Sequence, residues 1–276
     1  MDDIADAKSE LVIGIKPGGV AVLNADDERV AGMRHLRSDI GHRSFGINKP
    51  ADVMAKNIES AGLAGFRFEL VTPHGKMHAS LSVSGRHNLF NALAAAAVAD
   101  LADIPLERIA KSLAELTSQK MRGEILVFKS GFTLIDDSYN SNPAALVEMV
   151  GTLGTAPGFR RRIVVCGEML ELGSAGPRLH SEAGRSIAGS GIDLLIGIRG
   201  LAREMVSGAR QAGMDANAAI FFETPEDASD FLTKEIGEGV LILVKGSRGV
   251  KTEVVVERVK QLFELTTQAK TEKRVS

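Results

Sequence analysis

The segment VLILVK, Val240–Lys245, holds no polar residue before its terminal lysine. It leads into the glycine-containing turn GSRG and then into a segment of helical length. A strand without polar alternation is typical of a parallel sheet whose two faces are both covered by helices. The segment therefore predicts an α/β domain in the C-terminal part of the chain.

Three other short apolar runs precede this segment and share its character. They are Arg161–Cys166, Asp193–Ile198 and Ala218–Glu223. Segments of helical length follow the four runs, at Pro177–Ala188, Leu201–Ala212, Pro225–Glu235 and Thr252–Leu265. The alternation indicates a mainly parallel sheet, and Thr224 is a candidate N-cap. We place this domain at residues 158–276, with a polar tail from about residue 266.

The preceding part of the chain has a mixed pattern. Alternating runs with turn signals between them, as in Phe66–Gly85, indicate strands and hairpins. Two helices are expected, at His87–Ala102 and Pro105–Leu116. We assign residues 1–157 to a separate domain.

Composition excludes several classes of protein. The net charge is −2 and charged residues make up 25% of the chain, so no nucleic-acid or anionic-membrane partner is expected. Cys166 is the only cysteine, which excludes an internal disulfide and suits a reducing compartment. No apolar run approaches the roughly 18 residues that a membrane span requires. We expect a soluble, cytoplasmic protein.

The segment FTLIDDSYNSNPAAL, Phe132–Leu146, ends an apolar strand on two adjacent carboxylates, Asp136 and Asp137. Turn-forming residues follow, and Pro143 opens an expected helix. One interpretation is a turn and a helix cap. The other is a ligand site, because α/β sheets bind ligands beyond the carboxyl ends of their strands.

Three further segments offer ligand groups, each with a simpler alternative. Asn88 and Asn91 would share one helix face, where their side-chain amides suit the edge of a purine base. In the simpler alternative, Asn88 caps the helix and Asn91 forms a hydrogen bond to another helix. Arg122 precedes a strand, so a hairpin could bring it beside Asp137, or it could be a surface arginine. The turn Lys245–Thr252 does not fit the Walker A motif, but it could bind an anion or be a solvated glycine turn.

Six segments of the sequence, in the order in which they occur, resemble those of one family, the ATP-dependent Mur ligases of peptidoglycan synthesis. The segments are LNADD, GRHNLFNALAAAA, IDDSYNSNPAAL, GEMLELG, LHSEAG and LVKGSRG. They are most similar to the type that adds D-alanyl-D-alanine to UDP-N-acetylmuramoyl-tripeptide. The resemblance implies the later half of a central ATPase domain in residues 1–157, and a C-terminal Rossmann-like domain with a mainly parallel sheet in residues 158–276.

The resemblance also implies roles for single residues near the nucleotide. Asn88 and Asn91 match asparagines that approach the adenine of ATP. His87 beside them is kept as a catalytic candidate, although a packed or surface histidine is the simpler interpretation. Arg122, the other catalytic candidate, matches an arginine directed at the ATP phosphates, and Met121 stands where the family usually has glycine.

Two later segments match family loops around the nucleotide and the substrates. Asp137 matches the carboxylate that holds the ribose. The residues after it match a loop that faces the nucleotide and the domain interface: Tyr139, Asn140 and Asn142, with Asn140 as a substrate contact. A later turn matches one that closes over the acceptor and amine substrates: Lys245, Ser247 and Arg248.

The reaction that the resemblance implies uses ATP and Mg²⁺. ATP phosphorylates the terminal carboxylate of UDP-N-acetylmuramoyl-tripeptide, and the amine of D-Ala-D-Ala attacks the acyl phosphate to give an amide, ADP and phosphate. Positioning and charge stabilisation around the phosphates would be the protein's main contribution.

One departure from the family outweighs the others. The family's UDP-substrate domain, Walker A loop, metal ligands and carbamylated lysine do not occur in the sequence. We therefore expect a chain that begins about halfway through the central domain, is a monomer, has no metal ligands and has negligible ligase activity by itself. The alternatives are a non-catalytic nucleotide-binding module and an interaction module that complements a separately encoded half.

Overall fold

The computed structural model describes residues 2–266 of the chain. These residues divide into two compact units, with the boundary between Thr117 and Ser118. The polar tail expected from about residue 266 lies outside the described residues, apart from Thr266 itself.

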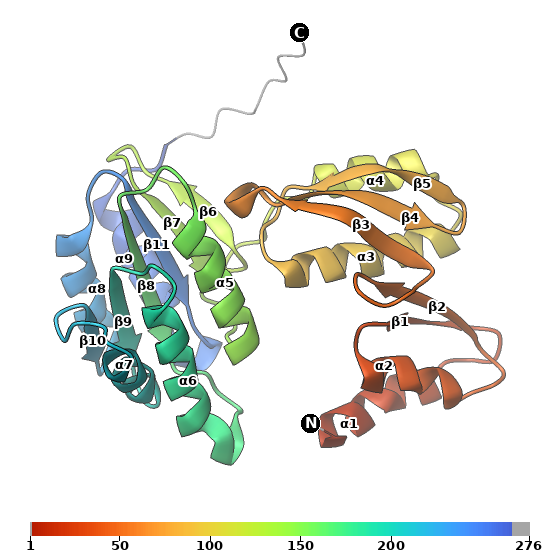
Figure 1. The fold of residues 1–276 in the computed structure, drawn as a ribbon, viewed down its shortest axis with the longest axis horizontal. Coiled ribbons are helices and arrows are strands. Elements are labelled where there is room, and N and C mark those ends of the chain that lie inside the picture. The colour runs from red at the N-terminus through yellow and green to blue at the C-terminus, as the bar shows by residue number, and fades with distance from the viewer. Residues whose placement is uncertain (1, 267–276) are drawn as a thin grey trace, which may run out of the picture. The chain divides into compact units, whose positions relative to one another are not determined.

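The first unit is built on a mixed sheet in the order β1-β2-β3-β4-β5 (Figure 1). Its strands are β1 (Val20–Asn24), β2 (Gly41–Gly46), β3 (Val53–Ser60), β4 (Phe66–Thr72) and β5 (Gly75–Leu81). Its helices are α1 (Asp2–Ile13), α2 (Glu28–Gly32), α3 (Arg86–Leu101) and α4 (Leu106–Ala114). Neighbours are parallel from β1 to β3 and antiparallel from β3 to β5. The alanine-rich α3 packs against the sheet, where Leu89 and Leu93 meet Phe68 and Leu70.

The second unit is a six-stranded sheet in the order β10-β9-β8-β11-β7-β6. Its strands are β6 (Glu124–Val127), β7 (Thr133–Asp137), β8 (Arg161–Gly167), β9 (Leu194–Ile198), β10 (Ala219–Phe222) and β11 (Val240–Lys245). Every neighbouring pair is parallel except β6–β7. The expected α/β class with a mainly parallel sheet is therefore confirmed.

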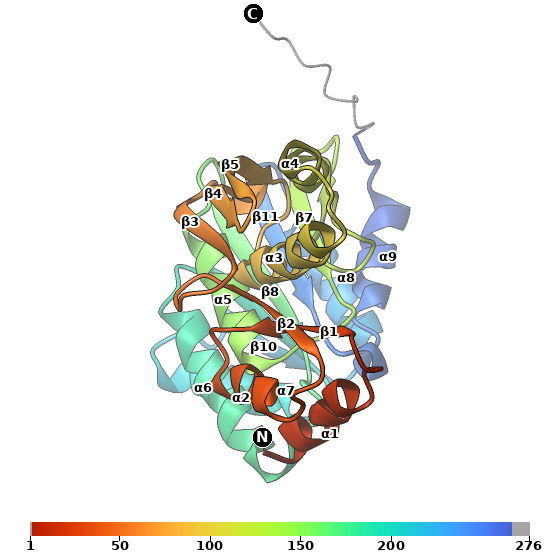
Figure 2. The same cartoon turned by 90° about the vertical axis from the view of Figure 1, so that its right-hand side faces the viewer.

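Helices cover both faces of this second sheet (Figures 1 and 2). They are α5 (Pro143–Thr155), α6 (Gly176–Ala188), α7 (Ala202–Gln211), α8 (Pro225–Glu235) and α9 (Glu253–Leu262). On one face, Leu232 of α8 and Val256 of α9 pack on Leu134 and Ile242. The other face carries α5, α6 and α7. All six residues of β11 are buried, which is why its sequence shows no polar alternation.

Two elements of the second unit have the bounds that the sequence predicts, β11 and α8. Thr224 caps α8, because its hydroxyl accepts the N–H of Asp227 at 3.2 Å. Elsewhere the helix ends differ by a few residues, as in α9, which ends at Leu262 rather than Leu265.

The boundary between the units differs from the expected one at residue 157. β7 pairs with β11 along its whole length, and β6 pairs with β7. Residues 118–157 therefore belong to the C-terminal sheet and not to the first unit. The sequence pattern identifies these strands, but it does not show that the partner of Asp137 is Lys245, which lies 108 residues later.

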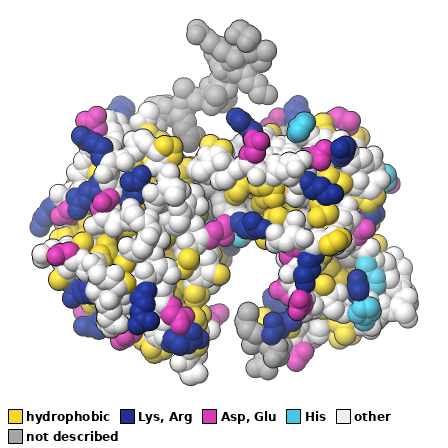
Figure 3. All heavy atoms as spheres, in the orientation of Figure 1, with side chains coloured by type: hydrophobic (Ala, Val, Ile, Leu, Met, Phe, Trp, Pro, Cys, Tyr) yellow, Lys and Arg dark blue, Asp and Glu magenta, His cyan; other side chains and the backbone are white. Residues whose placement is uncertain are grey.

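Among residues 2–266, none of the helices combines the length and the apolar character that crossing a membrane requires. On the face shown in Figure 3, lysine and arginine side chains are interspersed with aspartate and glutamate.

Candidate functional site

The candidate site lies at the carboxyl edge of the second sheet, where the loops that precede β6 and follow β7, β8 and β11 are found. Lys245, the last residue of β11, is in register with Asp137 of β7 and with Cys166 of β8. Antiparallel β6 begins at the same edge, where Glu124 is opposite Asp136. The neighbours β8 and β11 lead into α6 and α9, which lie on opposite faces of the sheet. Such a reversal marks the place where α/β sheets bind ligands.

Asp137 forms a buried ion pair with Lys245. The ammonium Nζ lies 2.5 Å from Asp137 Oδ2 and also donates to the Asn140 carbonyl at 3.1 Å. Only 4% of the Lys245 side chain and 11% of the Asp137 side chain are exposed. The Lys245 ammonium is thus directed at the protein, and not at solvent as the expected substrate contact would require.

Asp136 has a different environment from Asp137, because successive residues of a strand point to opposite faces. Its Oδ1 accepts the Ser138 hydroxyl at 2.5 Å and the Ser138 N–H at 3.2 Å. Burial raises the pKa of Asp136 despite these bonds. Asn142 caps α5 by accepting the N–H of Ala145 at 2.9 Å. The turn and the cap of the simpler interpretation are therefore both present.

Two arginines approach the ring of Tyr139, which lies in the loop after β7. The guanidinium carbon of Arg122 is 4.1 Å from the ring centroid, and that of Arg248 is 5.9 Å away. The Tyr139 N–H donates to the Met121 carbonyl at 3.1 Å, which ties the loop before β6 to the loop after β7. A guanidinium stacked on an aromatic face keeps its N–H groups free for a carboxylate or phosphate.

Ser247 is buried in the turn after β11. Its hydroxyl accepts the Leu170 N–H at 3.3 Å, so it holds the loop that follows β8. His180, which sequence reasoning did not single out, supports the same loop from α6. His180 Nε2 accepts the Met169 N–H at 2.9 Å and Nδ1 donates to the Gly176 carbonyl at 2.7 Å. The motif LHSEAG contained this histidine, but its full burial follows only from the fold.

The backbone at this edge adopts unusual conformations. Among the described residues, six that are not glycine have a positive φ. Four of them lie in the loops at the carboxyl edge: Met121, Glu171, Arg199 and Lys251, with φ of 63°, 63°, 63° and 62°. Non-glycine residues in this conformation cluster at functional sites more often than elsewhere.

The remaining sequence candidates lie in the first unit, at the start of α3. Gly85, with φ 91°, precedes the helix, so Asn88 is not its N-cap. The Asn88 amide instead donates to the Ser84 carbonyl at 2.7 Å. Asn91 follows one turn later and is exposed, and His87 is exposed as well. The two asparagines share the helix face that their spacing predicts.

Asp26 of the LNADD segment organises the loop after β2. It accepts N–H groups of Ile47, Asn48 and Lys49 at 2.6–3.1 Å. Burial raises the pKa of Asp26, but these hydrogen bonds outweigh the burial and hold it below its usual value.

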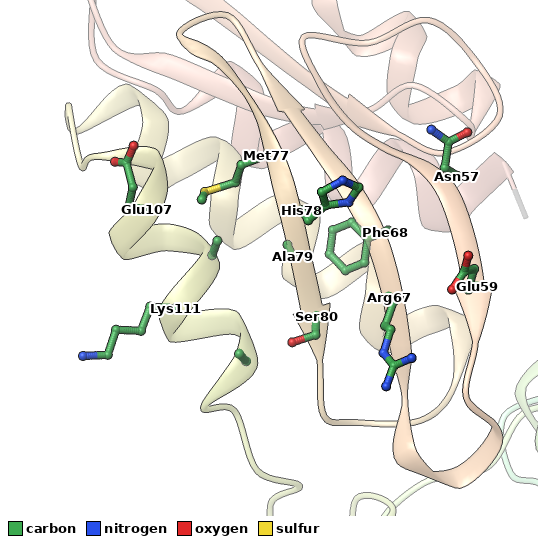
Figure 4. Close-up of a pocket in the computed structure, with 12 residues that line it drawn as sticks. Asn57, Glu59, Arg67, Phe68, Met77, His78, Ala79, Ser80, Glu107 and Lys111 are labelled. Carbon is green, nitrogen blue, oxygen red and sulfur yellow. The ribbon is translucent and has the colours of Figure 1, made fainter. Parts of the chain in front are cut away.

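A groove of about 650 Å³ runs along α4 and the outer face of the β3–β5 strands (Figure 4). Its lining combines apolar side chains, such as Phe68 and Met77, with charged ones, such as Lys111. Glu59 and Arg67 are opposite each other in register. The residues singled out from the sequence do not line this groove.

Two family models match the chain. The model described as "Mur ligase middle domain" matches residues 1–99, and the one described as "Mur ligase, glutamate ligase domain" matches residues 121–248. The chain belongs to the Mur ligase family. The gap between the two matches contains the boundary between the structural units, at residues 117 and 118.

Relatives within the family carry the same printed name, UDP-N-acetylmuramoyl-tripeptide–D-alanyl-D-alanine ligase. The Escherichia coli protein is 33% identical over 94% of this chain and 56% of its own length. The protein of Buchnera aphidicola subsp. Baizongia pistaciae is 31% identical over 93% of this chain and 54% of its own length. The chain thus spans about half the length of the curated relatives it matches.

Solved structures of Mur ligases have the same fold. A crystal structure of MurF from Acinetobacter baumannii matches with a TM-score of 0.81 and 29% identity, over 94% of this chain and 56% of that one. MurF from Thermotoga maritima, solved with ADP, matches with a TM-score of 0.77 and 22% identity, over 94% of this chain and 57% of that one.

Proposed function

We propose that this chain supplies the nucleotide-facing loops and the C-terminal domain of an ATP-dependent ligase that adds D-Ala-D-Ala to UDP-N-acetylmuramoyl-tripeptide in the cytoplasm. The observation that carries the proposal is the grouping of Arg122, Tyr139 and Asp137 at one edge of a mainly parallel sheet. Relatives named for this reaction align with 93–94% of the chain.

The side chains at this edge suit a nucleoside phosphate. Arg122, stacked on Tyr139, offers planar N–H donors to phosphate oxygens. Asp137 Oδ1 is the oxygen left to accept hydrogen bonds from ribose hydroxyls, since Oδ2 is bound to Lys245. Asn88 and Asn91 in the first unit are proposed for the adenine edge. When bound, ATP would supply the phosphoryl group that activates the acceptor carboxylate.

The side chains beyond this group would serve the other two substrates. Arg248 is exposed beside Tyr139, and its guanidinium suits a carboxylate of the acceptor or of D-Ala-D-Ala. The exposed Asn140 amide offers a further polar contact. Within residues 2–266, histidine, cysteine and acidic side chains form no group of three or more that could hold a metal ion, so no residue of this chain is proposed as a Mg²⁺ ligand.

Calorimetric titration of the chain with ADP tests the nucleotide site. We expect measurable binding that weakens about tenfold or more in Arg122→Ala, because a charge-assisted hydrogen bond contributes about 1.5–3 kcal/mol. Arg185→Ala is the control, since Arg185 is an exposed arginine on α6 that contacts Gln211. Equal ADP affinity in the two variants would contradict the proposal.

Phosphate release tests the division of labour in the reaction. With ATP, UDP-N-acetylmuramoyl-tripeptide and D-Ala-D-Ala, we expect negligible release by the chain alone, because residues 1–276 contain no Walker A motif. Robust release that depends on D-Ala-D-Ala would overturn the expectation that the chain is inactive by itself.

A further inference from the structure

Lys245 occupies a position in which a lysine is rarely found. It ends a central strand, and its side chain is 4% exposed. A lysine ammonium is almost never buried unless it is paired, because removing it from water is unfavourable. Here the pairing is provided by two oxygen atoms, Asp137 Oδ2 at 2.5 Å and the Asn140 carbonyl at 3.1 Å.

These two oxygen atoms belong to different segments. Asp137 is the last residue of β7, whereas Asn140 lies in the loop that leads to α5. The same loop is held at Tyr139 by the Met121 carbonyl and at its far end by the cap on α5. The ammonium therefore fixes the middle of the loop relative to the strand that precedes it.

The ion pair also fixes the orientation of the Asp137 carboxylate. With Oδ2 in a charge-assisted bond to a buried partner, the side chain loses its rotational freedom. Its second oxygen, Oδ1, is then held in one direction before a ligand arrives. A binding group that is already ordered does not lose that freedom on binding, so the affinity rises.

The segment after Lys245 holds the neighbouring loops in the same way. Ser247 accepts the Leu170 N–H at 3.3 Å, and the Arg248 guanidinium lies 5.9 Å from the Tyr139 ring. Three of the four residues from Lys245 to Arg248 thus contact the loop after β7 or the loop after β8. For Lys245 and Ser247, whose polar atoms bond within the protein, this arrangement suits a support for ligand-binding loops better than a ligand contact.

We propose that Lys245 is a positioning residue for nucleotide binding, which orders the Asp137 carboxylate and the loop 138–142 without contacting the nucleotide. The proposal rests on the proposed function, in which Asp137 Oδ1 accepts hydrogen bonds from ribose hydroxyls. It replaces the sequence-based expectation that Lys245 contacts the acceptor or amine substrate.

A double-mutant cycle on the full 276-residue chain tests this role. ADP affinity is measured for the unmodified chain, Lys245→Met, Asp137→Asn and the double variant. We expect each single variant to lose about tenfold or more in affinity, and the double variant to bind about as weakly as Asp137→Asn alone. Lys129→Met is the matched control, because Lys129 is an exposed lysine at the opposite end of β7, paired with Glu264.

Amide hydrogen exchange without nucleotide provides a second, independent readout. Lys245→Met should speed exchange in peptides covering residues 138–142 and leave peptides of β9 unchanged. If Lys245→Met does not fold, Lys245→Gln takes its place in both experiments, since its neutral amide removes the charge-assisted bond to Asp137 and still fills the buried space.

The outcomes separate this inference from the proposed function. ADP binding by Lys245→Met equal to that of the unmodified chain would overturn the positioning role. Additive losses in the cycle would overturn it too, because they show that Lys245 affects nucleotide affinity independently of the Asp137 carboxylate. Absence of ADP binding by the unmodified chain would instead refute the nucleotide site. In that case the positioning role is tested by amide hydrogen exchange alone, and an unchanged exchange rate at residues 138–142 in Lys245→Met overturns it.

Discussion

The contact between α6 and α7 depends on two glycines, and substituting one of them should separate the helices. A Cβ added to Gly208 of α7 would lie 2.2 Å from the Ser181 carbonyl oxygen of α6. A Cβ added to Gly184 of α6 would lie 1.9 Å from the Met205 carbonyl oxygen of α7. In both places the obstacle is backbone, which cannot move aside as a flexible side chain can.

The magnitude for Gly208→Ala follows from this distance. Ordinary van der Waals contact begins at 3.4 Å, so the helices must separate by 3.4 − 2.2 = 1.2 Å at this point. Overpacking of this kind destabilises by about 1–3 kcal/mol, and we expect the upper end because two helix backbones must move. Replacing a helical glycine by alanine contributes about 1 kcal/mol in the other direction. The net loss in the free energy of unfolding is therefore about 2 kcal/mol.

Gly151→Ala is the matched control for the same change. Gly151 lies within α5 and is exposed, and apart from its chain neighbours and its own helix backbone no described atom lies within 4 Å of the position that its Cβ would take. Only the helix-propensity gain of about 1 kcal/mol should remain, so the two variants should differ by about 3 kcal/mol. Hydrogen exchange of β8 and β9 peptides in increasing urea measures this difference for the second unit alone. Equal stability of the two variants would refute the close approach of α6 and α7.

Three further predictions concern buried or bonded side chains. Asp137→Ala leaves the Lys245 ammonium without its carboxylate and should lower the free energy of unfolding of the second unit by about 3–5 kcal/mol, whereas Asp137→Leu combined with Lys245→Met should be about neutral. Urea denaturation compares the two variants, and a mild effect of Asp137→Ala would argue against a buried ion pair. Because folding lowers the pKa of Asp26, the contribution of this carboxylate to stability is fully present above its pKa in the unfolded chain, about 3.9, and is lost as the pH falls through its pKa in the folded chain. In thermal melts, the stability advantage of the unmodified chain over Asp26→Asn should therefore shrink below about pH 4, and an advantage that does not change with pH would contradict this. Burial raises the pKa of Cys166 to about 12, so iodoacetamide at pH 8 should modify this thiol only after the chain unfolds. Mass spectrometry detects the modification, and rapid modification of the folded chain would contradict the burial of Cys166.

The sequence predicts the second unit best where one rule acts alone. β11 is apolar up to its terminal lysine because both of its faces are covered, and α8 begins at a proline after a capping threonine. Both patterns are local, so their bounds can be read directly. The boundary between the units depends on strand pairing instead, and pairing across 108 residues leaves no local pattern.

The candidate site was predicted in part, for the same reason. The antiparallel pairing of β6 with β7, which places Glu124 opposite Asp136, is a short-range feature that the sequence pattern indicates. The stacking of Arg122 on Tyr139, the burial of Lys245 and the support of Met169 by His180 each join segments that are distant in sequence or require a particular rotamer. A family resemblance can indicate such residues, but it cannot show which of them face a ligand and which face the protein.

The position of β11 between β8 and β7 has a consequence for the order of folding. This strand is the last of the described strands to leave the ribosome, yet it lies inside the sheet. Until Val240–Lys245 has emerged, β7 and β8 each present an open edge with unpaired backbone groups, which is the kind of edge that pairs with other chains. The second unit should therefore complete its sheet late in synthesis, and a nascent chain that stalls before residue 240 should be prone to aggregation.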